Sequence, residues 1–264
     1  MRLKIRVNLH KTEDIPFNYQ YQLHSALYSL IRKSSSEYST FLHDTGFIDE
    51  KKNLKLFTFS KCYFPIRKLT KYGFSKVNNF ELFFSTPIEK SFEHLVLGIF
   101  SNQTFLLKFE QRQISCFIEN VETLPIPKYS KEMTFTCLSP IAIACNDDNY
   151  SGKHYLDYMK PDEKPKFVEG IKSNLMRKYR IIKTEEYTRT DDFEFSFDPE
   201  YIVKRQGKIK KNITFKDNRI IAMEAPFAIQ ANSELIKIGY ECGFGSENSA
   251  GFGMVEVVKS ERQK

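Results

Sequence analysis

The segment RLKIRVNL, residues 2–9, alternates polar and apolar side chains without a break. A period of two is typical of a β-strand that buries one face and exposes the other. Apolar residues then recur at helical spacing, which predicts a helix over residues 19–33 with one buried stripe. The stripe consists of Tyr19, Leu23, Leu27 and Leu30. The amino-terminal region therefore opens with a strand followed by a helix.

Four further segments extend this order. Runs rich in Phe and other strand-forming residues predict strands over residues 55–60, 79–86 and 114–122. A helix is predicted over residues 88–100, because Pro87 stands in its first turn, where a missing N–H costs nothing. The resulting order is β-α-β-β-α-β, the ferredoxin-like pattern that RNA recognition motifs also use.

Residues 125–131 contain two prolines and interrupt the pattern, so we expect a linker there. It separates an amino-terminal domain, residues 1–124, from a carboxy-terminal domain, residues 132–264. The predicted elements of the second domain are a strand over residues 133–144, a helix over 162–179, strands over 193–203 and 213–229 that form a hairpin, a helix over 232–240 and a strand over 253–258. The fold class is thus α+β, with two tandem ferredoxin-like (RRM-like) domains.

Composition narrows the classes of protein to which this chain can belong. Lys and Arg outnumber Asp and Glu by 40 to 33, which is compatible with a polyanionic partner without demanding one. The five cysteines are scattered without a C-x-x-C pair, so we expect a reducing compartment. The sequence shows no metal-binding motif, no signal peptide and no long apolar run. We expect a soluble, cytoplasmic protein with no bound metal or cofactor.

Residues 243–253, GFGSENSAGFG, are the strongest local signal. Two G-F-G units flank a short polar stretch between a predicted helix and a predicted strand. Glycine permits positive φ and lets a ligand approach backbone N–H groups, which together can form an anion-binding hollow. The alternative is a tight connection in which the glycines only make the bend. Four glycines in this symmetric arrangement favour a backbone-mediated contact with a ligand.

Several segments resemble one known family. The stretch from Ile238 to Val255 resembles the glycine-rich loop of the Cas six family, the CRISPR-associated endoribonucleases of the RAMP superfamily that process precursor guide RNA. The family pattern of two G-x-G units, each with an apolar middle residue, is complete here. Further similar segments are MRLKIRV at residues 1–7, NYQYQL at 18–23, KLFTFS at 55–60 and TCLSPIA at 136–142. The resemblance therefore runs from one end of the chain to the other.

The resemblance implies a reaction and a partner. CRISPR repeat RNA is the expected substrate, cleaved without a metal ion by attack of a 2′-hydroxyl on the adjacent phosphodiester. The products would be a 2′,3′-cyclic phosphate and a 5′-hydroxyl. Such an enzyme must align the RNA backbone, move two protons and stabilise the charged phosphorane. A homodimer and a place among effector-complex subunits both remain open.

Three catalytic residues follow from the same resemblance. Tyr28 on the first helix matches the family's tyrosine and would orient the 2′-hydroxyl. His43, expected in a loop, would be the general acid or base. Lys55 would stabilise the charge on the phosphate. Reserve candidates are His24, Lys51 and Lys52.

Basic and polar residues of the second domain are the expected RNA contacts. A run of cations in the predicted hairpin can neutralise phosphates, although such runs are more often solvated tips. The expected contacts are Lys204, Arg205, Lys208, Lys210, Lys211, Gly243, Gly245, Ser246, Asn248, Ser249, Gly251 and Gly253. Two alternative functions remain open, because fold alone does not determine function. One is a non-catalytic protein that binds repeat RNA, and the other is a small-molecule-binding or structural protein of the same fold.

Overall fold

The computed structural model describes residues 1–49, 52–146, 153–188 and 192–258, and it divides into two compact units. The first unit consists of Met1–Ile126, Thr214–Asn218 and Ser249–Gly251, and the second consists of the other described residues. Two short segments of the region expected to form the second domain therefore group with the first unit. Among the described residues, none of the helices combines the length and the apolar composition that a membrane span requires.

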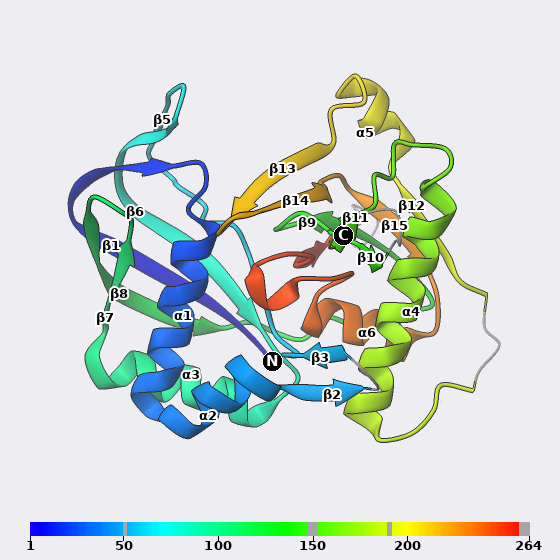
Figure 1. Ribbon diagram of the computed structural model, residues 1–264, viewed down its shortest axis with the longest axis horizontal. Coiled ribbons are helices and arrows are strands. Elements are labelled where there is room, and N and C mark those ends of the chain that lie inside the picture. The colour runs from blue at the N-terminus through cyan, green and yellow to red at the C-terminus, as the bar shows by residue number, and fades with distance from the viewer. Residues whose placement is uncertain (50–51, 147–152, 189–191, 259–264) are drawn as a thin grey trace, which may run out of the picture. The chain divides into compact units, whose positions relative to one another are not determined.

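The first unit is built on an antiparallel sheet with the strand order β4-β6-β1-β8-β7 (Figure 1). Its strands are β1 (Arg2–Pro16), β4 (Thr58–Phe59), β5 (Lys68–Leu69), β6 (Gly73–Ser85), β7 (Thr104–Lys108) and β8 (Gln113–Thr123). The helices α1 (Gln20–Ser34) and α3 (Glu89–Asn102) form the two crossovers. The strands β4, β6, β1 and β8 occupy the four places of a ferredoxin-like sheet, so the predicted topology is confirmed for this unit.

The alternation along β1 explains how this sheet is buried. Leu3, Ile5 and Val7 are at most 1% exposed and belong to the core beneath the helices. The helix α1 packs closely on α3 at Gly98, where a Cβ atom would lie 1.9 Å from the carbonyl oxygen of Leu30. Only glycine permits such an approach of two helix backbones. The contact holds α1 firmly against the core.

The connection between α1 and β4 is more structured than predicted. It contains α2 (Ser36–Thr40), a π-helical turn η1 (Phe41–Thr45), β2 (Phe47–Asp49) and β3 (Lys52–Leu54). His43 thus lies in a π-helical turn, and the predicted loop at this position is wrong. The strand predicted over residues 55–60 is reduced to β4. Leu56 adopts a left-handed φ of +53°, which interrupts an extended chain.

The second unit repeats the topology of the first. Its sheet has the order β12-β15-β9-β16, with all neighbouring strands antiparallel. The strands are β9 (Glu132–Cys137), β12 (Glu194–Phe197), β15 (Phe227–Gln230) and β16 (Val255–Val257), and the crossover helices are α4 (Lys164–Lys183) and α6 (Ser233–Cys242). The prediction of tandem ferredoxin-like folds is therefore confirmed.

Two predicted strands of this unit end early. The strand predicted over residues 133–144 stops at Cys137, because Pro140 has no N–H to donate to a neighbouring strand. The chain then forms a separate pair, β10 (Ala144–Asn146) with β11 (Lys153–Tyr155). The strand predicted over residues 193–203 ends at Phe197. There the Asp198 carboxylate accepts two backbone N–H groups and caps a new helix, α5 (Pro199–Lys204).

The strand predicted over residues 213–229 is in fact three strands. The first two, β13 (Lys210–Phe215) and β14 (Asn218–Met223), form a hairpin of their own, and β15 follows. The basic run at residues 204–211 therefore spans the end of α5 and the start of β13, and it is not the hairpin tip that we predicted. The tip consists of Lys216 and Asp217.

Candidate active site

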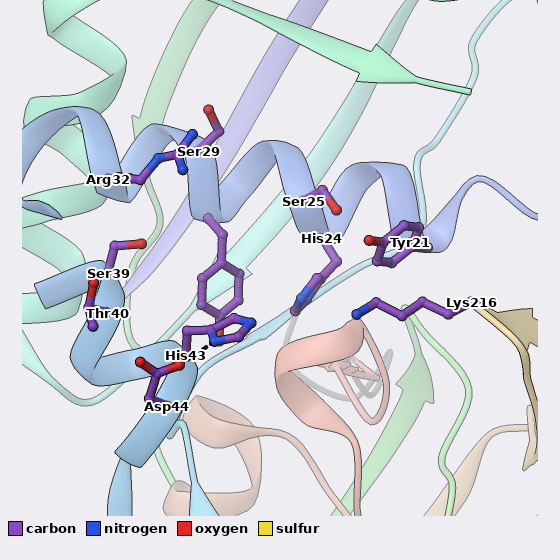
Figure 2. Close-up of a pocket in the computed structure, with 11 residues that line it drawn as sticks. Tyr21, His24, Ser25, Ser29, Arg32, Ser39, Thr40, His43, Asp44 and Lys216 are labelled. Atoms are coloured by element: carbon purple, nitrogen blue, oxygen red, sulfur yellow. Dashed lines mark hydrogen bonds and ion pairs between the residues drawn. The ribbon is translucent and has the colours of Figure 1, made fainter. Parts of the chain in front are cut away.

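A polar pocket of about 410 Å³ opens in the first unit (Figure 2). It is lined by Tyr21, His24, Ser25, Tyr28, Ser29, Arg32, Ser39, Thr40, His43, Asp44 and Lys216. Figure 2 shows the side chains of His24, His43 and Lys216 directed toward one another. Two permanent cations, Arg32 and Lys216, face a single carboxylate in this lining, which favours an anionic ligand.

Helical spacing brings two of the predicted residues together. His24 and Tyr28 stand four residues apart on α1 and therefore share one face of the helix. Their ring centroids lie 4.6 Å apart. The first turn of α1 is fastened within the same unit, because the side-chain amide of Gln20 donates a hydrogen bond to the carbonyl of Gly251. The reserve candidate His24 is thus part of the pocket together with Tyr28.

The protonation of His24 follows from its contacts. Its Nδ1 lies 2.7 Å from the carbonyl oxygen of Ser249, and a carbonyl can only accept, so Nδ1 carries a proton. Burial lowers the pKa of His24 to about 4, against a smaller opposing effect of this hydrogen bond. The ring is therefore neutral near pH 7, and its Nε2 has a lone pair that can accept a proton.

The buried His24 predicts a pH dependence of folding. The folded-state pKa lies below the unfolded value, so the unfolded chain binds this proton more tightly and stability rises with pH between about 4 and 6.5. In His24→Gln, the loss of unfolding free energy from about pH 7 to about pH 4.5 should be smaller than in the native chain by about 2 kcal/mol. Urea unfolding at the two pH values measures the difference. His10→Gln, at an exposed position, is the control; an equal loss in both variants would contradict the expectation.

Tyr28 lies between the two histidines of the pocket. Its ring centroid is 4.6 Å from that of His24 and 6.4 Å from that of His43. Burial raises the pKa of Tyr28 above its ordinary value, although a hydrogen bond with the Ser249 side chain opposes the shift. The phenol therefore remains protonated near pH 7 and can donate a hydrogen bond.

His43 reaches the pocket from the π-helical turn. Its side chain is 72% exposed, and its Nδ1 lies 2.6 Å from the carboxylate of Asp44. A carboxylate in this position accepts a hydrogen bond from the imidazole and orients it. Turns of π-helix occur frequently at functional sites, because they widen the backbone locally. Sequence inspection had named His43 but had missed Asp44.

Lys55 is beside the pocket but does not line it. Its ammonium group donates a hydrogen bond of 3.0 Å to the backbone carbonyl of His43. Burial lowers the pKa of Lys55, while the nearby Asp44 raises it. The lysine thus braces the turn that carries His43. Of the two reserve lysines, Lys52 lies in β3 outside the pocket lining, and Lys51 lies outside the described residues.

Lys216 is a further pocket residue that the sequence analysis did not predict. It stands at the tip between β13 and β14 with a left-handed φ of +53°, a conformation that costs energy in a residue other than glycine. Its ammonium group lies 5.3 Å from the ring centroid of Tyr21. Phe215, its neighbour, packs edge-on against His24 at 5.3 Å. The polar pair Lys216-Asp217 between two alternating segments is compatible with a turn, whereas the sequence analysis predicts one continuous strand there.

The glycine-rich loop owes its glycines to its backbone shape. Gly243, Gly245, Gly251 and Gly253 all have φ between +74° and +87° and are buried. A Cβ atom on Gly253 would lie 1.9 Å from the carbonyl oxygen of Phe244. The loop also satisfies its own polar groups, since the Asn248 amide donates to the carbonyls of Phe244 and Phe252. Direct RNA contact by this loop remains a prediction.

A buried lysine fastens the part of this loop that belongs to the second unit. Lys178 on α4 is 1% exposed, and its ammonium group donates to three oxygen atoms. These are the carbonyls of Gly243 at 2.6 Å and Gly245 at 3.2 Å and the side chain of Asn248 at 2.6 Å. Burial lowers the pKa of Lys178 to about 8. The group is therefore still charged near pH 7, and each of its three protons has an acceptor.

The predicted basic contacts are exposed to different extents. Lys204, Arg205 and Lys208 are exposed around the end of α5. Lys210 pairs with Asp157 at 2.8 Å, and Lys211 approaches Glu224 at 3.7 Å. These two cations are partly neutralised within the protein. RNA binding by the five residues stays a prediction.

Both halves of the chain match models of one protein family. Residues 14–121 match the family model for the CRISPR-associated protein Cas6, N-terminal, and residues 122–257 match the model for its C-terminal part. A CRISPR-associated endoribonuclease Cas6 of Pyrococcus furiosus is 30% identical over 253 residues, covering 95% of this chain and 86% of the relative. Another of Methanocaldococcus jannaschii is 29% identical over 265 residues, covering 100% and 95%.

A solved structure supports the same assignment. The structure of a CRISPR associated protein Cas6 matches with a TM-score of 0.76 at 28% identity, covering 98% of this chain and 99% of that chain. The fold and the site therefore define a protein of two ferredoxin-like folds with a histidine-containing pocket in the first. The chain belongs to the Cas6 family of CRISPR-associated proteins.

Proposed function

We propose that the chain is a metal-independent endoribonuclease that cleaves CRISPR repeat RNA to generate guide RNAs. The observation that carries the proposal is the convergence of His24, Tyr28 and His43 in one polar pocket. Relatives at 29% and 30% identity are named CRISPR-associated endoribonucleases, which supports RNA cleavage as the reaction. Two imidazoles in one pocket suit a reaction in which one proton is removed and another is supplied.

The attacking oxygen belongs to the substrate. The lone pair of His24 Nε2 accepts the proton of a 2′-hydroxyl, and the 2′-oxygen bonds to the adjacent phosphorus. The bond from phosphorus to the 5′-oxygen breaks, and His43, oriented by Asp44, supplies the proton that this oxygen takes up. The products are a 2′,3′-cyclic phosphate and a 5′-hydroxyl. Exchange with water returns both histidines to their starting states.

Hydrogen-bond donors and cations around the pocket stabilise the phosphorane. The phenol of Tyr28 stays protonated, so it can donate to the 2′-oxygen or to a phosphate oxygen. Lys216 and Arg32 line the pocket and can face the developing negative charge. Lys55 acts indirectly, because its hydrogen bond holds the turn that carries His43. The phosphate cation is therefore Lys216, in place of the Lys55 that the resemblance suggested.

The proposal is tested with purified protein and its cognate repeat RNA in the presence of EDTA. We expect cleavage at one position, and mass spectrometry should find a cyclic phosphate on the upstream fragment. A single 2′-deoxy substitution at the cut should abolish product, because it removes the nucleophile. Cleavage of the deoxy-substituted RNA, or cleavage only after a divalent metal is restored, would contradict the mechanism. A tight complex that never yields product would favour the non-catalytic alternative.

Replacement of Lys216 and replacement of Lys55 should lower the cleavage rate to different extents. Lys216→Ala should lower the single-turnover rate constant by about a hundredfold, as expected for removal of a group that stabilises the transition state. Lys55→Ala should lower it less, because Lys55 only supports the backbone of His43. Rates are compared at saturating protein, with Lys216→Arg expected to recover part of the loss. A larger loss in Lys55→Ala than in Lys216→Ala would restore Lys55 as the phosphate cation.

A further inference from the structure

A hairpin of the first unit exposes an unusually long stretch of chain. Residues 65–72, which include β5, are all exposed. Their backbone is nevertheless paired: Lys68 and Leu69 lie opposite Ser75 and Phe74 of β6, and the Thr70 N–H donates to Gly73 at 2.9 Å. Figure 1 shows the hairpin standing out from the rest of its sheet. A paired but exposed segment of this kind can present side chains to a partner without first having to fold.

Positive charge gathers around this hairpin. Residues 52–80 contain seven Lys or Arg and no Asp or Glu, whereas the chain as a whole has 40 against 33. The exposed cations of the hairpin and its neighbouring strand are Arg67, Lys68, Lys71 and Lys76. We call these four residues, together with the exposed Tyr63 and Tyr72, the β5 patch. Such a cluster of cations suits a polyanionic partner.

Two carboxylates on the adjoining strands are already paired with cations outside the hairpin. Glu81 of β6 is already paired with Lys4 at 3.1 Å and Arg6 at 3.2 Å. Glu13 of β1 lies 3.5 Å from Arg112 and 3.8 Å from Lys11. Glu81 and Glu13 therefore do not neutralise the four cations of the β5 patch.

Aromatic side chains lie exposed among the cations. Tyr63 is 58% and Tyr72 75% exposed, and the ammonium group of Lys71 lies 5.3 Å from the Tyr72 ring centroid. Both tyrosines are mounted on hydrogen-bonded backbone. The Tyr63 N–H donates to Glu81 at 2.8 Å, and the Tyr72 carbonyl accepts from Phe17 at 3.1 Å. Exposed apolar patches rimmed by polar residues often mark interaction sites, and unpaired bases stack on aromatic rings.

The β5 patch adjoins the helix that carries the pocket. Phe17, which bonds to Tyr72 through its N–H, packs on Phe74 with ring centroids 5.2 Å apart. The Cys62 N–H donates to the hydroxyl of Tyr19 at 2.9 Å. The helix α1 begins at Gln20, and Tyr21 in its first turn already lines the pocket. A strand leaving the pocket past Tyr21 would therefore meet the patch.

We propose that the β5 patch binds an unpaired segment of the RNA whose cleaved phosphate occupies the pocket. The inference rests on the proposed function for its ligand. Bases of the segment stack on Tyr72 and Tyr63, and Arg67, Lys68 and Lys71 contact its phosphates. Single-stranded RNA is favoured over duplex, because paired bases do not present their faces to a side chain.

Binding of fluorescent single-stranded repeat RNA tests the proposal, with the same RNA annealed to its complement as the comparison. Tyr72→Ala should weaken single-strand binding by about tenfold, and Tyr72→Phe should retain most of it, because stacking needs only the ring. Lys68→Ser with Lys71→Ser should lower the slope of log affinity against log salt by about 1.4. Duplex binding should change much less in the tyrosine variants.

Phe100→Ala is the matched control, because Phe100 is a 67% exposed aromatic on α3 outside the patch. It should bind RNA as the native chain does. Phe100→Ala should also cleave at the native rate, because Phe100 lies outside the pocket lining. Unchanged single-strand affinity in Tyr72→Ala and in the double lysine variant would overturn the inference while leaving the nuclease proposal intact. Loss of single-strand binding in these variants of a chain that never cleaves would support the patch and overturn the nuclease.

Discussion

Replacing His43 by alanine is expected to lower the single-turnover cleavage rate by about a hundredfold to ten-thousandfold, the range typical of a lost general acid or base. The side chain is 72% exposed, and its only polar side-chain contact among the described hydrogen bonds is with Asp44. Its removal should therefore change neither folding nor RNA affinity appreciably. The loss should appear in the rate of the chemical step at saturating protein.

The experiment pairs a quench-flow cleavage assay with a separate measurement of RNA affinity. His10→Ala, at an exposed position outside the pocket lining, should cleave at the native rate. Asp44→Asn should lose less than His43→Ala, because the imidazole remains in the pocket and the new amide oxygen can still accept a hydrogen bond from it. If His43→Ala cleaves normally, His43 is not the acid, and His24→Ala becomes the decisive variant.

The second large effect concerns stability. Lys178→Met is expected to lower the free energy of unfolding by about 3 to 5 kcal/mol. Methionine fills a similar volume but donates nothing, so the carbonyls of Gly243 and Gly245 and the side chain of Asn248 lose a shared donor in a buried place. The glycine-rich loop should loosen first, and amide hydrogen exchange should report it there.

Lys166→Met is the matched control on the same helix. Lys166 is exposed, and its replacement should change the free energy of unfolding by less than about 0.5 kcal/mol. Urea unfolding of the native chain and both variants measures the difference. Equal stability of Lys178→Met and the native chain would mean that the three oxygens find other donors, and the anchoring role would be wrong.

Local patterns predicted most of the elements and missed those that depend on single residues. Periods of two and of helical spacing identified β1, α1, α4 and α6, because each buries one face. The strand predicted over residues 193–203 failed because a capping carboxylate at Asp198 turned the chain into α5. The strand predicted over residues 213–229 failed because the tip at Lys216 contains no glycine or proline.

The residues of the site also divide into those that the sequence predicted and those that it did not. Tyr28 and His24 could be placed on one helix face from their spacing alone, and the positive φ of the four loop glycines followed from their residue type. The resemblance to the Cas six family drew attention to His43. None of these observations could distinguish a lysine that lines the pocket from one that supports it, because lysines 216 and 55 differ only in what they touch.

The sequence by itself determined the two β-α-β-β-α-β repeats, since burial of one face imposes a period on every strand and helix. Only the tertiary structure decided the chemistry of the pocket. The carbonyl that fixes the tautomer of His24 belongs to Ser249, 225 residues away, and Lys216 comes from a turn that is also far from α1 along the chain. Periodicity describes neighbours along the chain, whereas a pKa and a hydrogen bond depend on neighbours in space.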